Sequence, residues 1–160
     1  MKKKKTVYLE STIPSYLASR PSRDLIVAGH QQLTEDWWVR RRKDFNLYIS
    51  QFVIDEVSMG DSEIAQKRLN FLNDIPDLLI NESVEDLASG LVSSRAIPKK
   101  AAQDAAHIAI AAVHSIDYLL TWNCRHIANA ELIPIVSKIC NSHGFTCPII
   151  CTPEELMGEK

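Results

Sequence analysis

Ala-Ala-Gln-Asp-Ala-Ala-His-Ile, residues 101–108, is the stretch that decides the fold of this chain. It opens a run that reaches Val113, in which most residues are small or apolar and are good helix formers. A helix so rich in alanine lets a sheet or another helix approach closely, so we expect it to be largely buried. Because burying a lone carboxylate costs several kcal/mol, Asp104 must be paired, protonated or bound to a cation.

The size and charge of the chain are ordinary for a globular domain. Its 160 residues are 46% hydrophobic and 24% charged, with a formal net charge of −2. The molecule is therefore no polycation, and any attraction to nucleic acid must come from local patches. Two basic stretches exist, Lys2–Lys5 and Arg40–Lys43. A solvated terminus and a basic helix end are the simpler interpretations of both.

The cysteines and the apolar runs indicate a cytoplasmic protein. Cysteines at positions 124, 140, 147 and 151 show neither a CxxC pair nor zinc-ligand spacing, so we expect reduced and mostly packed thiols. No run of about 18 apolar residues is present, which predicts that no helix crosses a membrane. The N-terminal lysines lead directly into a strand-like segment, which argues against a secretory signal.

Short β-branched or apolar runs alternate with longer helical patterns along the whole chain. The expected strands are residues 6–9, 47–49, 78–80, 118–121 and 149–151. The expected helices are a short one after Pro14, then 24–42, 51–59, 61–73, 83–95, 101–115, 131–142, and a short appended helix over 152–160. This alternation predicts a single α/β domain over residues 1–160, with a parallel sheet covered by helices on both faces.

Three acidic residues that are far apart in the sequence occupy comparable positions. Glu10 ends the first strand, Glu56 lies on the helix after the second, and Asp104 lies at the start of the alanine-rich helix. Since ligands bind outside the carboxyl ends of the strands in open α/β sheets, we hypothesise that the three carboxylates converge on one divalent cation. Oxygen ligands suit Mg²⁺ or Mn²⁺, which can activate a water and neutralise the charge of a phosphodiester.

Each of these residues also has a simpler interpretation. Glu10 would serve equally well as a charge near the following turn. Glu56 would equally well face solvent, and the neighbouring Asp55 competes for any role. Asp104 would be a plain surface residue in a helical first turn. His107, one turn further along the same helix face, is more often a satisfied core or rim residue than a ligand.

Four stretches that together span nearly the whole chain carry a resemblance to a known family. They are Val-Tyr-Leu-Glu-Ser-Thr-Ile-Pro-Ser-Tyr-Leu (7–17), Ile-Ser-Gln-Phe-Val-Ile-Asp-Glu-Val (49–57), Asp-Ala-Ala-His-Ile-Ala-Ile-Ala (104–111) and Tyr-Leu-Leu-Thr-Trp-Asn (118–123). The chain resembles the PIN domain family of metal-dependent ribonucleases, and its VapC-like toxin branch in particular. That resemblance implies a parallel sheet of strand order 3-2-1-4-5.

The resemblance also implies the function and the residues that perform it. The chain would be a metal-dependent endoribonuclease acting on RNA and the toxin of a type II toxin–antitoxin pair, with a cognate antitoxin protein as partner and a homodimeric assembly. Its catalytic residues would be Glu10, Glu56, Asp104 and Asn123. The first three of these would hold Mg²⁺ or Mn²⁺. Substrate would be positioned by Thr12, Thr121 and Arg125, although turn chemistry explains Thr121 and Asn123 equally well.

Two departures from the family pattern leave other functions open. The first acidic position is usually Asp, and Glu10 adds a methylene. The fourth position is usually acidic, and Asn123 removes a negative charge that a second metal would need. The alternative hypothesis is therefore a PIN-like RNA- or protein-binding module with a weakened, non-catalytic metal site. A phosphotransferase is disfavoured, because it would usually need Asp in place of Glu10 and there is no glycine-rich phosphate loop.

Overall fold

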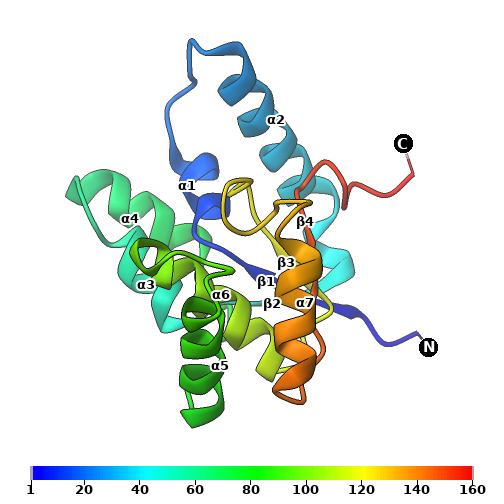
Figure 1. Ribbon diagram of the computed structural model, residues 1–160. Coiled ribbons are helices and arrows are strands. Elements are labelled where there is room, and N and C mark those ends of the chain that lie inside the picture. The colour runs from blue at the N-terminus through cyan, green and yellow to red at the C-terminus, as the bar shows by residue number, and fades with distance from the viewer. Residues whose placement is uncertain (1, 160) are drawn as a thin grey trace.

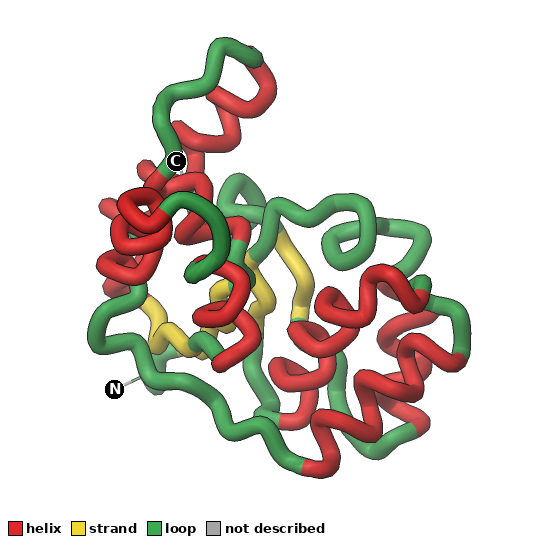
Figure 2. The backbone as a smooth tube through the Cα atoms, turned by 90° about the vertical axis from the view of Figure 1, so that its left-hand side faces the viewer, coloured by secondary structure: helices red, strands yellow, loops and turns green. Residues whose placement is uncertain are grey.

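The computed structural model describes residues 2–159 and shows a parallel four-stranded sheet flanked by helices (Figures 1 and 2). The strands are β1 (Lys5–Leu9), β2 (Phe45–Tyr48), β3 (Tyr118–Leu120) and β4 (Ile149–Cys151). Every neighbouring pair is parallel, and the order across the sheet is β2-β1-β3-β4. The α/β class predicted from the sequence is confirmed.

The helices lie close to the ranges expected from the sequence. They are α1 (Thr12–Ala18), α2 (Leu25–Arg40), α3 (Gln51–Val57), α4 (Ser62–Phe71), α5 (Glu82–Ser93), α6 (Ala102–Val113) and α7 (Ile133–Ser142), with short 3-10 turns η1 (Arg42–Asp44) and η2 (Lys99–Ala101). Asp24 caps α2 by accepting from two backbone N–H groups, and Asp61 caps α4 in the same way. Asn81 caps α5, so this helix begins one residue before the expected range of 83–95. In residues 2–159 no helix combines the length and apolar character needed to cross a membrane.

The strand expected over residues 78–80 does not form. A single parallel bridge joins Ile49 to Asp77, with the Leu78 N–H donating to the Ile49 carbonyl at 2.8 Å. Leu79 is 72% exposed, so extending the ladder would bury little apolar surface there. The four strands that form keep the relative order 2-1-4-5 of the prediction, and the bridge lies beside β2, where strand 3 of the prediction was expected.

The helix expected over residues 152–160 is reduced to one turn. The Thr152 N–H and hydroxyl both donate to the Glu155 carboxylate, at 3.2 and 3.0 Å, as a capping box predicts. The Leu156 N–H then closes the turn on the Thr152 carbonyl at 3.2 Å. The turn goes no further, because the Leu156 carbonyl accepts the Trp37 indole N–H at 3.2 Å and Gly158 has a φ of 79°.

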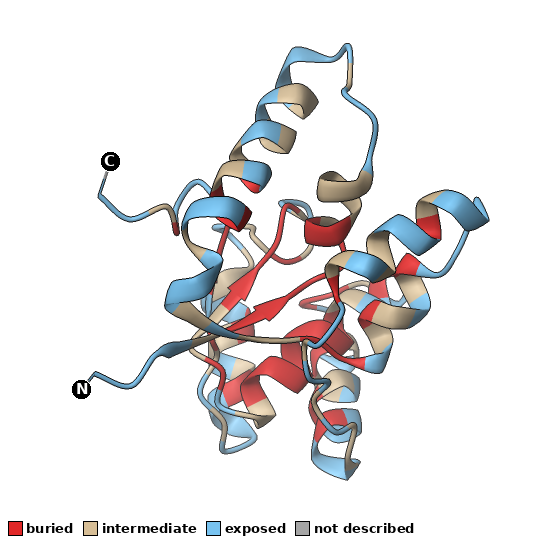
Figure 3. Ribbon diagram, turned by 180° about the vertical axis from the view of Figure 1, so that it is seen from behind, coloured by how far each residue is buried: buried red, intermediate tan, exposed pale blue. Residues whose placement is uncertain are grey.

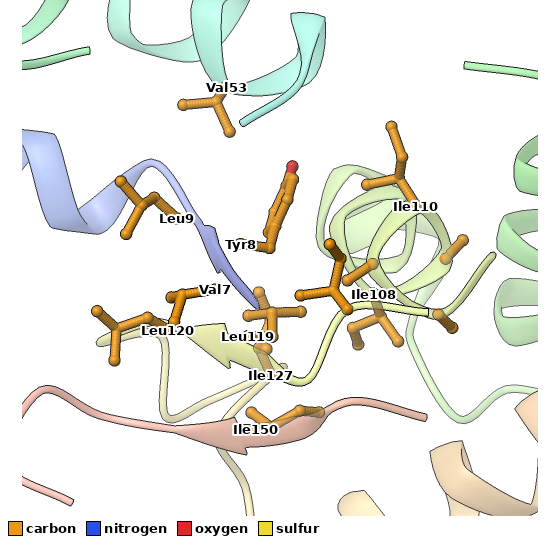
Figure 4. Close-up of a cluster of buried hydrophobic side chains, with 14 of the residues drawn as sticks. Val7, Tyr8, Leu9, Val53, Ile108, Ile110, Leu119, Leu120, Ile127 and Ile150 are labelled. Carbon is orange, nitrogen blue, oxygen red and sulfur yellow. The ribbon is translucent and has the colours of Figure 1, made fainter. Parts of the chain in front are cut away.

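The alanine-rich helix α6 packs into the centre of the molecule, as predicted. All residues from Ala105 to Ala112 are buried, and so are Val7, Tyr8 and Leu9 of β1 (Figure 3). The close-up in Figure 4 shows Ile108 beside Leu119 of β3, so the helix lies against the strands with little between them. Small side chains make this approach possible, and the same closeness leaves no room for larger ones.

We expect Ala109→Leu to lower the free energy of unfolding by about 1–3 kcal/mol, because Ala109 is 0% exposed and a larger side chain must displace packed neighbours. Ala102→Leu is the matched control, since Ala102 is exposed on the same helix and should change stability by less than about 0.5 kcal/mol. Urea denaturation measures both. Equal effects of the two substitutions would contradict the close packing of α6.

Candidate functional site

Glu10 follows β1 directly and lies at the carboxyl end of the sheet, where its carboxylate is surrounded by hydroxyl groups. The side-chain oxygen Oε1 accepts hydrogen bonds from Thr12 at 2.5 Å and from Thr121 at 2.6 Å, and Oε2 accepts one from Ser11 at 2.8 Å. Glu10 is only 3% exposed. Three donors around a buried carboxylate offset the loss of its hydration shell.

Two of these hydroxyls also fix the loop that follows β3. Thr12 Oγ1 accepts the backbone N–H of Trp122 at 2.9 Å, and Thr121 Oγ1 accepts that of Asn123 at 2.9 Å. Each threonine thus donates to the Glu10 carboxylate and accepts from the loop. The position of Asn123 is set by the same residues that hold Glu10.

Asp104, in the first turn of α6, faces this group. Burial raises the pKa of its carboxyl above the ordinary value, and the negative charge of Glu10 raises it further. A hydrogen bond with the Asn123 side chain and the nearby His107 and His126 act in the opposite direction, but the pKa remains raised overall. Glu10, Asp104 and Asn123 therefore form one electrostatic group, although they come from three separate parts of the chain.

Glu56 lies outside this group and is paired with His107. Its Oε1 contacts His107 Nε2, and the other ring nitrogen, Nδ1, lies 2.6 Å from the Tyr8 hydroxyl. The Tyr8 hydroxyl is in turn 2.7 Å from Ser50 Oγ. Tyr8, Ser50 and His107 are all 0% exposed. Figure 4 shows the Tyr8 hydroxyl directed away from β1 toward the ribbon that carries Val53, which is α3.

One arrangement of protons satisfies this chain of hydrogen bonds with a neutral histidine. His107 Nε2–H donates to Glu56, Nδ1 accepts from the Tyr8 hydroxyl, and the Tyr8 oxygen accepts from Ser50. Burial raises the pKa of Tyr8 far above its ordinary value, so the phenol remains protonated and able to donate. The interpretation of His107 as a satisfied core residue is confirmed.

An aromatic cluster that sequence reasoning missed borders the loop after β3. The Trp122 ring stacks on His30 at a centroid distance of 3.9 Å, and Tyr16 meets both rings edge-on at 6.3 Å. Burial raises the pKa of Tyr16, and nearby negative charge that includes Glu10 adds to the effect. Tyr16 and His30 remain partly exposed beside the carboxylates. The only signal in the sequence was that Trp122 follows Thr121 directly.

The predicted site residues are thus partly brought together. Glu10, Asp104, Asn123, Thr12 and Thr121 lie in one group, while Glu56 is turned to His107 and Arg125 is exposed on the loop beyond Asn123. Within residues 2–159, no three His, Cys, Asp or Glu side chains are arranged to hold a metal ion. The three-carboxylate metal group of the sequence hypothesis is not formed by these side-chain positions.

The group that does form still fits a hydrated divalent cation. Mg²⁺ is usually held by one or two carboxylates together with waters and substrate phosphates. Glu10 and Asp104 supply two carboxylates. The Asn123 amide oxygen already accepts the His126 backbone N–H at 3.0 Å, so it would contact a cation only through its second lone pair. The raised pKa of Asp104 reflects burial and like charge, and a bound cation would relieve both. Metal binding remains a prediction.

The fold is similar to that of a solved chain from the crystal structure of VapBC2 from Rickettsia felis bound to a DNA fragment from their promoter. The TM-score is 0.51 and the sequence identity 16%, and the alignment covers 92% of this chain and 98% of that chain. No family model and no curated protein matches the sequence. At this identity the likeness shows the fold alone.

We expect Tyr8→Phe to lower the free energy of unfolding by about 1–3 kcal/mol, because it leaves His107 Nδ1 and Ser50 without their buried partner. Tyr118→Phe is the matched control. The Tyr118 ring packs edge-on against Phe45 at 6.1 Å, but its hydroxyl makes no hydrogen bond within residues 2–159, so the change should stay within about 0.5 kcal/mol. Chemical denaturation of both variants measures the difference. Indistinguishable midpoints would contradict the buried hydrogen-bond chain.

Asp104→Asn should stabilise the metal-free protein relative to wild type near pH 7 but not near pH 3. The folded-state pKa of Asp104 is raised above 3.8, so wild type loses stability as the pH rises from that value through the raised pKa. The variant lacks this loss. Thermal unfolding in EDTA across this pH range measures the difference.

Asp117→Asn should change the stability of the fold with pH in the opposite direction. Hydrogen bonds from the Thr6 backbone and hydroxyl, together with Lys5, lower the pKa of Asp117, so its carboxylate stabilises the fold above the ordinary pKa and loses this effect as the pH falls. This variant should be most destabilised at neutral pH. Parallel pH profiles for the two variants would refute the electrostatic account of Asp104.

Proposed function

We propose that the protein is a divalent-metal-dependent endoribonuclease that hydrolyses phosphodiester bonds of RNA. The observation that carries this proposal is the pairing of two carboxylates, Glu10 and Asp104, in a partly desolvated group at the carboxyl end of a parallel sheet. The two carboxylates repel each other without a cation, and a phosphodiester is attacked more readily when a cation neutralises its charge. A bound Mg²⁺ or Mn²⁺ would activate a water and neutralise charge on the phosphate.

The residues of the chain then have distinct roles in the proposed reaction. Thr12 and Thr121 hold the Glu10 carboxylate in place through their hydroxyls, and this sets its position before any substrate arrives. Asn123 lies beside Asp104 and would hold its carboxylate through the side-chain amide. Arg125, exposed on the same loop, would contact a phosphate of the RNA.

Glu56 lies outside the group of Glu10 and Asp104, and it would act in the proposed site only through its second oxygen. Only Oε1 is hydrogen-bonded within residues 2–159, to His107, which leaves Oε2 for a water or the metal. The Glu56 side chain is 33% exposed, so solvent reaches it. His107 thus fixes the direction in which Glu56 can act.

The biological setting follows from the same resemblance. The fold match is to a chain of the VapBC2 complex, and this supports the proposal that the protein is a toxin that pairs with an antitoxin protein. A cytoplasmic location and a homodimer are part of the same proposal and rest on the sequence and the family resemblance alone. The antitoxin would hold the ribonuclease inactive by covering the carboxylates.

A second candidate is a PIN-like RNA- or protein-binding module without catalysis. The observation that favours it is that Glu56 is turned to His107 rather than to Glu10 and Asp104. Calorimetry with Mg²⁺ and Mn²⁺ separates the two candidates. A ribonuclease of the proposed kind binds one of the ions and loses that binding in Asp104→Asn, whereas a non-catalytic module shows no such loss.

We expect Asp104→Asn to reduce RNA cleavage at least about 100-fold, because removing a metal-holding carboxylate forfeits several kcal/mol of transition-state stabilisation. Asp55→Asn is the matched control, since Asp55 is exposed on α3 next to Glu56 and should cleave like wild type. The assay follows a labelled single-stranded RNA with Mn²⁺ and with EDTA. Cleavage by Asp104→Asn at the wild-type rate would refute the proposal.

A further inference from the structure

Two basic stretches of the sequence, Lys2–Lys5 and Arg40–Lys43, meet in the fold although they are far apart in the chain. The first leads into β1 and the second into β2, and these strands pair in parallel. Both stretches therefore stand at the amino-terminal end of the sheet. Lys4 Nζ donates to the Lys43 carbonyl at 2.8 Å, which joins the two directly.

A pocket of about 420 Å³ opens where they meet and runs alongside β2. Its lining includes three cationic side chains together with an aromatic ring and two amides: Lys4, Arg42, Lys43, Tyr48, Asn46 and Asn73. We call this the β2 pocket. It continues along the outer side of β2, which is the edge strand of the sheet.

The positive charge of the β2 pocket is largely unneutralised. In the part of the chain that the structure describes, ion pairs engage Lys5 and Arg41, but none engages Lys4, Arg42 or Lys43. One carboxylate, Asp74, lies on the opposite wall. The pocket therefore carries a net positive charge on a molecule whose formal net charge is −2.

Arg42 is held in position by a neighbouring ring. Its guanidinium lies 4.4 Å from the centroid of the Trp38 ring, and this cation–π contact limits its motion. The edge of a stacked guanidinium keeps its N–H groups free, in a fork that suits the two oxygens of a phosphate. The pocket thus offers a positioned guanidinium that can donate hydrogen bonds to an anion, in addition to its lysines.

We infer that the β2 pocket is a second contact site for single-stranded RNA, separate from the carboxylates. Cations that track a backbone, beside an aromatic face, are the combination that binds single strands, and the amides of Asn46 and Asn73 can reach base edges. The basic side chains stand at the amino end of β1 and Glu10 at its carboxyl end. A strand of five residues spans about 16 Å, so one RNA strand would bridge both sites.

The inference rests on the proposed ribonuclease function only for the choice of RNA as the nucleic acid. The β2 pocket would hold a flank of the substrate while the scissile phosphate lies at the carboxylates. It would raise affinity through phosphate contacts and would not take part in bond breaking. Its removal should therefore weaken binding and raise KM while leaving kcat unchanged.

The test compares two triple variants of the full chain that remove the same charge. The pocket variant removes the three cations of the β2 pocket by combining Lys4→Ala, Arg42→Ala and Lys43→Ala. The control combines Arg23→Ala, Lys67→Ala and Lys138→Ala, which removes three exposed cations elsewhere. Binding of a fluorescein-labelled single-stranded RNA ten-mer is followed by anisotropy in EDTA at several salt concentrations, so that no cleavage occurs. Circular dichroism checks that both variants are folded.

We expect the pocket variant to bind at least about tenfold more weakly than wild type, and the slope of log affinity against log salt to fall by about 2, since each phosphate contact contributes roughly 0.7 for a single strand. The control should bind within about twofold of wild type. In wild type, 4-thiouridine in the RNA should crosslink to peptides that carry residues 42–48 or 73–76. Equal losses in both variants, no loss in either, or no binding by wild type would overturn the inference.

These outcomes are separable from the fate of the proposed function. Wild type that cleaves RNA, with a pocket variant that binds like the control, refutes the second site and leaves the ribonuclease intact. Binding that depends on the pocket, without cleavage by wild type in Mn²⁺, supports the second site and refutes the ribonuclease.

Discussion

The hydrogen bonds that run from Ser50 through Tyr8 and His107 to Glu56 are the constraint on which the rest of the structure depends. They join β1, the start of α3 and the middle of α6 in the dry interior, where an unpaired hydroxyl or imidazole would be costly. Glu10 comes two residues after Tyr8, and Asp104 comes one helical turn before His107. The same bonds that tie the three elements together therefore set where both carboxylates emerge.

Glu10 is also a buried polar group that needs hydrogen-bond partners, and hydroxyl groups supply them in place of an imidazole. Ser11, Thr12 and Thr121 surround a carboxylate that is almost wholly buried, and the two threonines pass the constraint on to the loop after β3. Asp104 has fewer partners, and its raised pKa shows where the electrostatic strain of the site remains. The Glu10 carboxylate thus already has hydrogen-bond donors on both oxygens, whereas the Asp104 carboxylate would be stabilised more by a bound cation or another positive group.

Periodicity and composition predicted most of the fold, because strands and helices alternate and the burial of α6 follows from its alanines. These patterns did not predict the structure where a contact between residues far apart in the sequence determines whether an element forms or where it ends. The chain at Leu78–Ile80 has the composition of a strand but no neighbour to pair with beyond one bridge, and the turn at Leu156 ends on the Trp37 indole. Ile26 shares helical spacing with the buried Trp37 yet is 72% exposed, because α2 extends beyond the sheet there.

For the site, residue type and position predicted that Glu10 and Asp104 would lie together with Glu56, and the family resemblance added Asn123. The structure places Glu10, Asp104 and Asn123 together without Glu56. The partner of Glu56 was not predictable, because nothing in the sequence pairs Glu56 with His107, whose ring is oriented by the Tyr8 and Ser50 contacts. Those contacts join residues that are 42 to 99 positions apart, so no local pattern encodes them.

The edge of the sheet at β2 has a consequence for how copies of the chain meet. Among the described residues 2–159, Ile49 alone, just beyond β2, pairs outward with another segment. Most of this strand therefore presents backbone groups that a strand from a second molecule would match. The lysines and arginine beside it oppose such a meeting, because an identical edge would bring its own cations into contact with them. The basic side chains thus disfavour edge-to-edge aggregation, whatever ligand they bind. This effect weakens at high salt, because salt screens their charge.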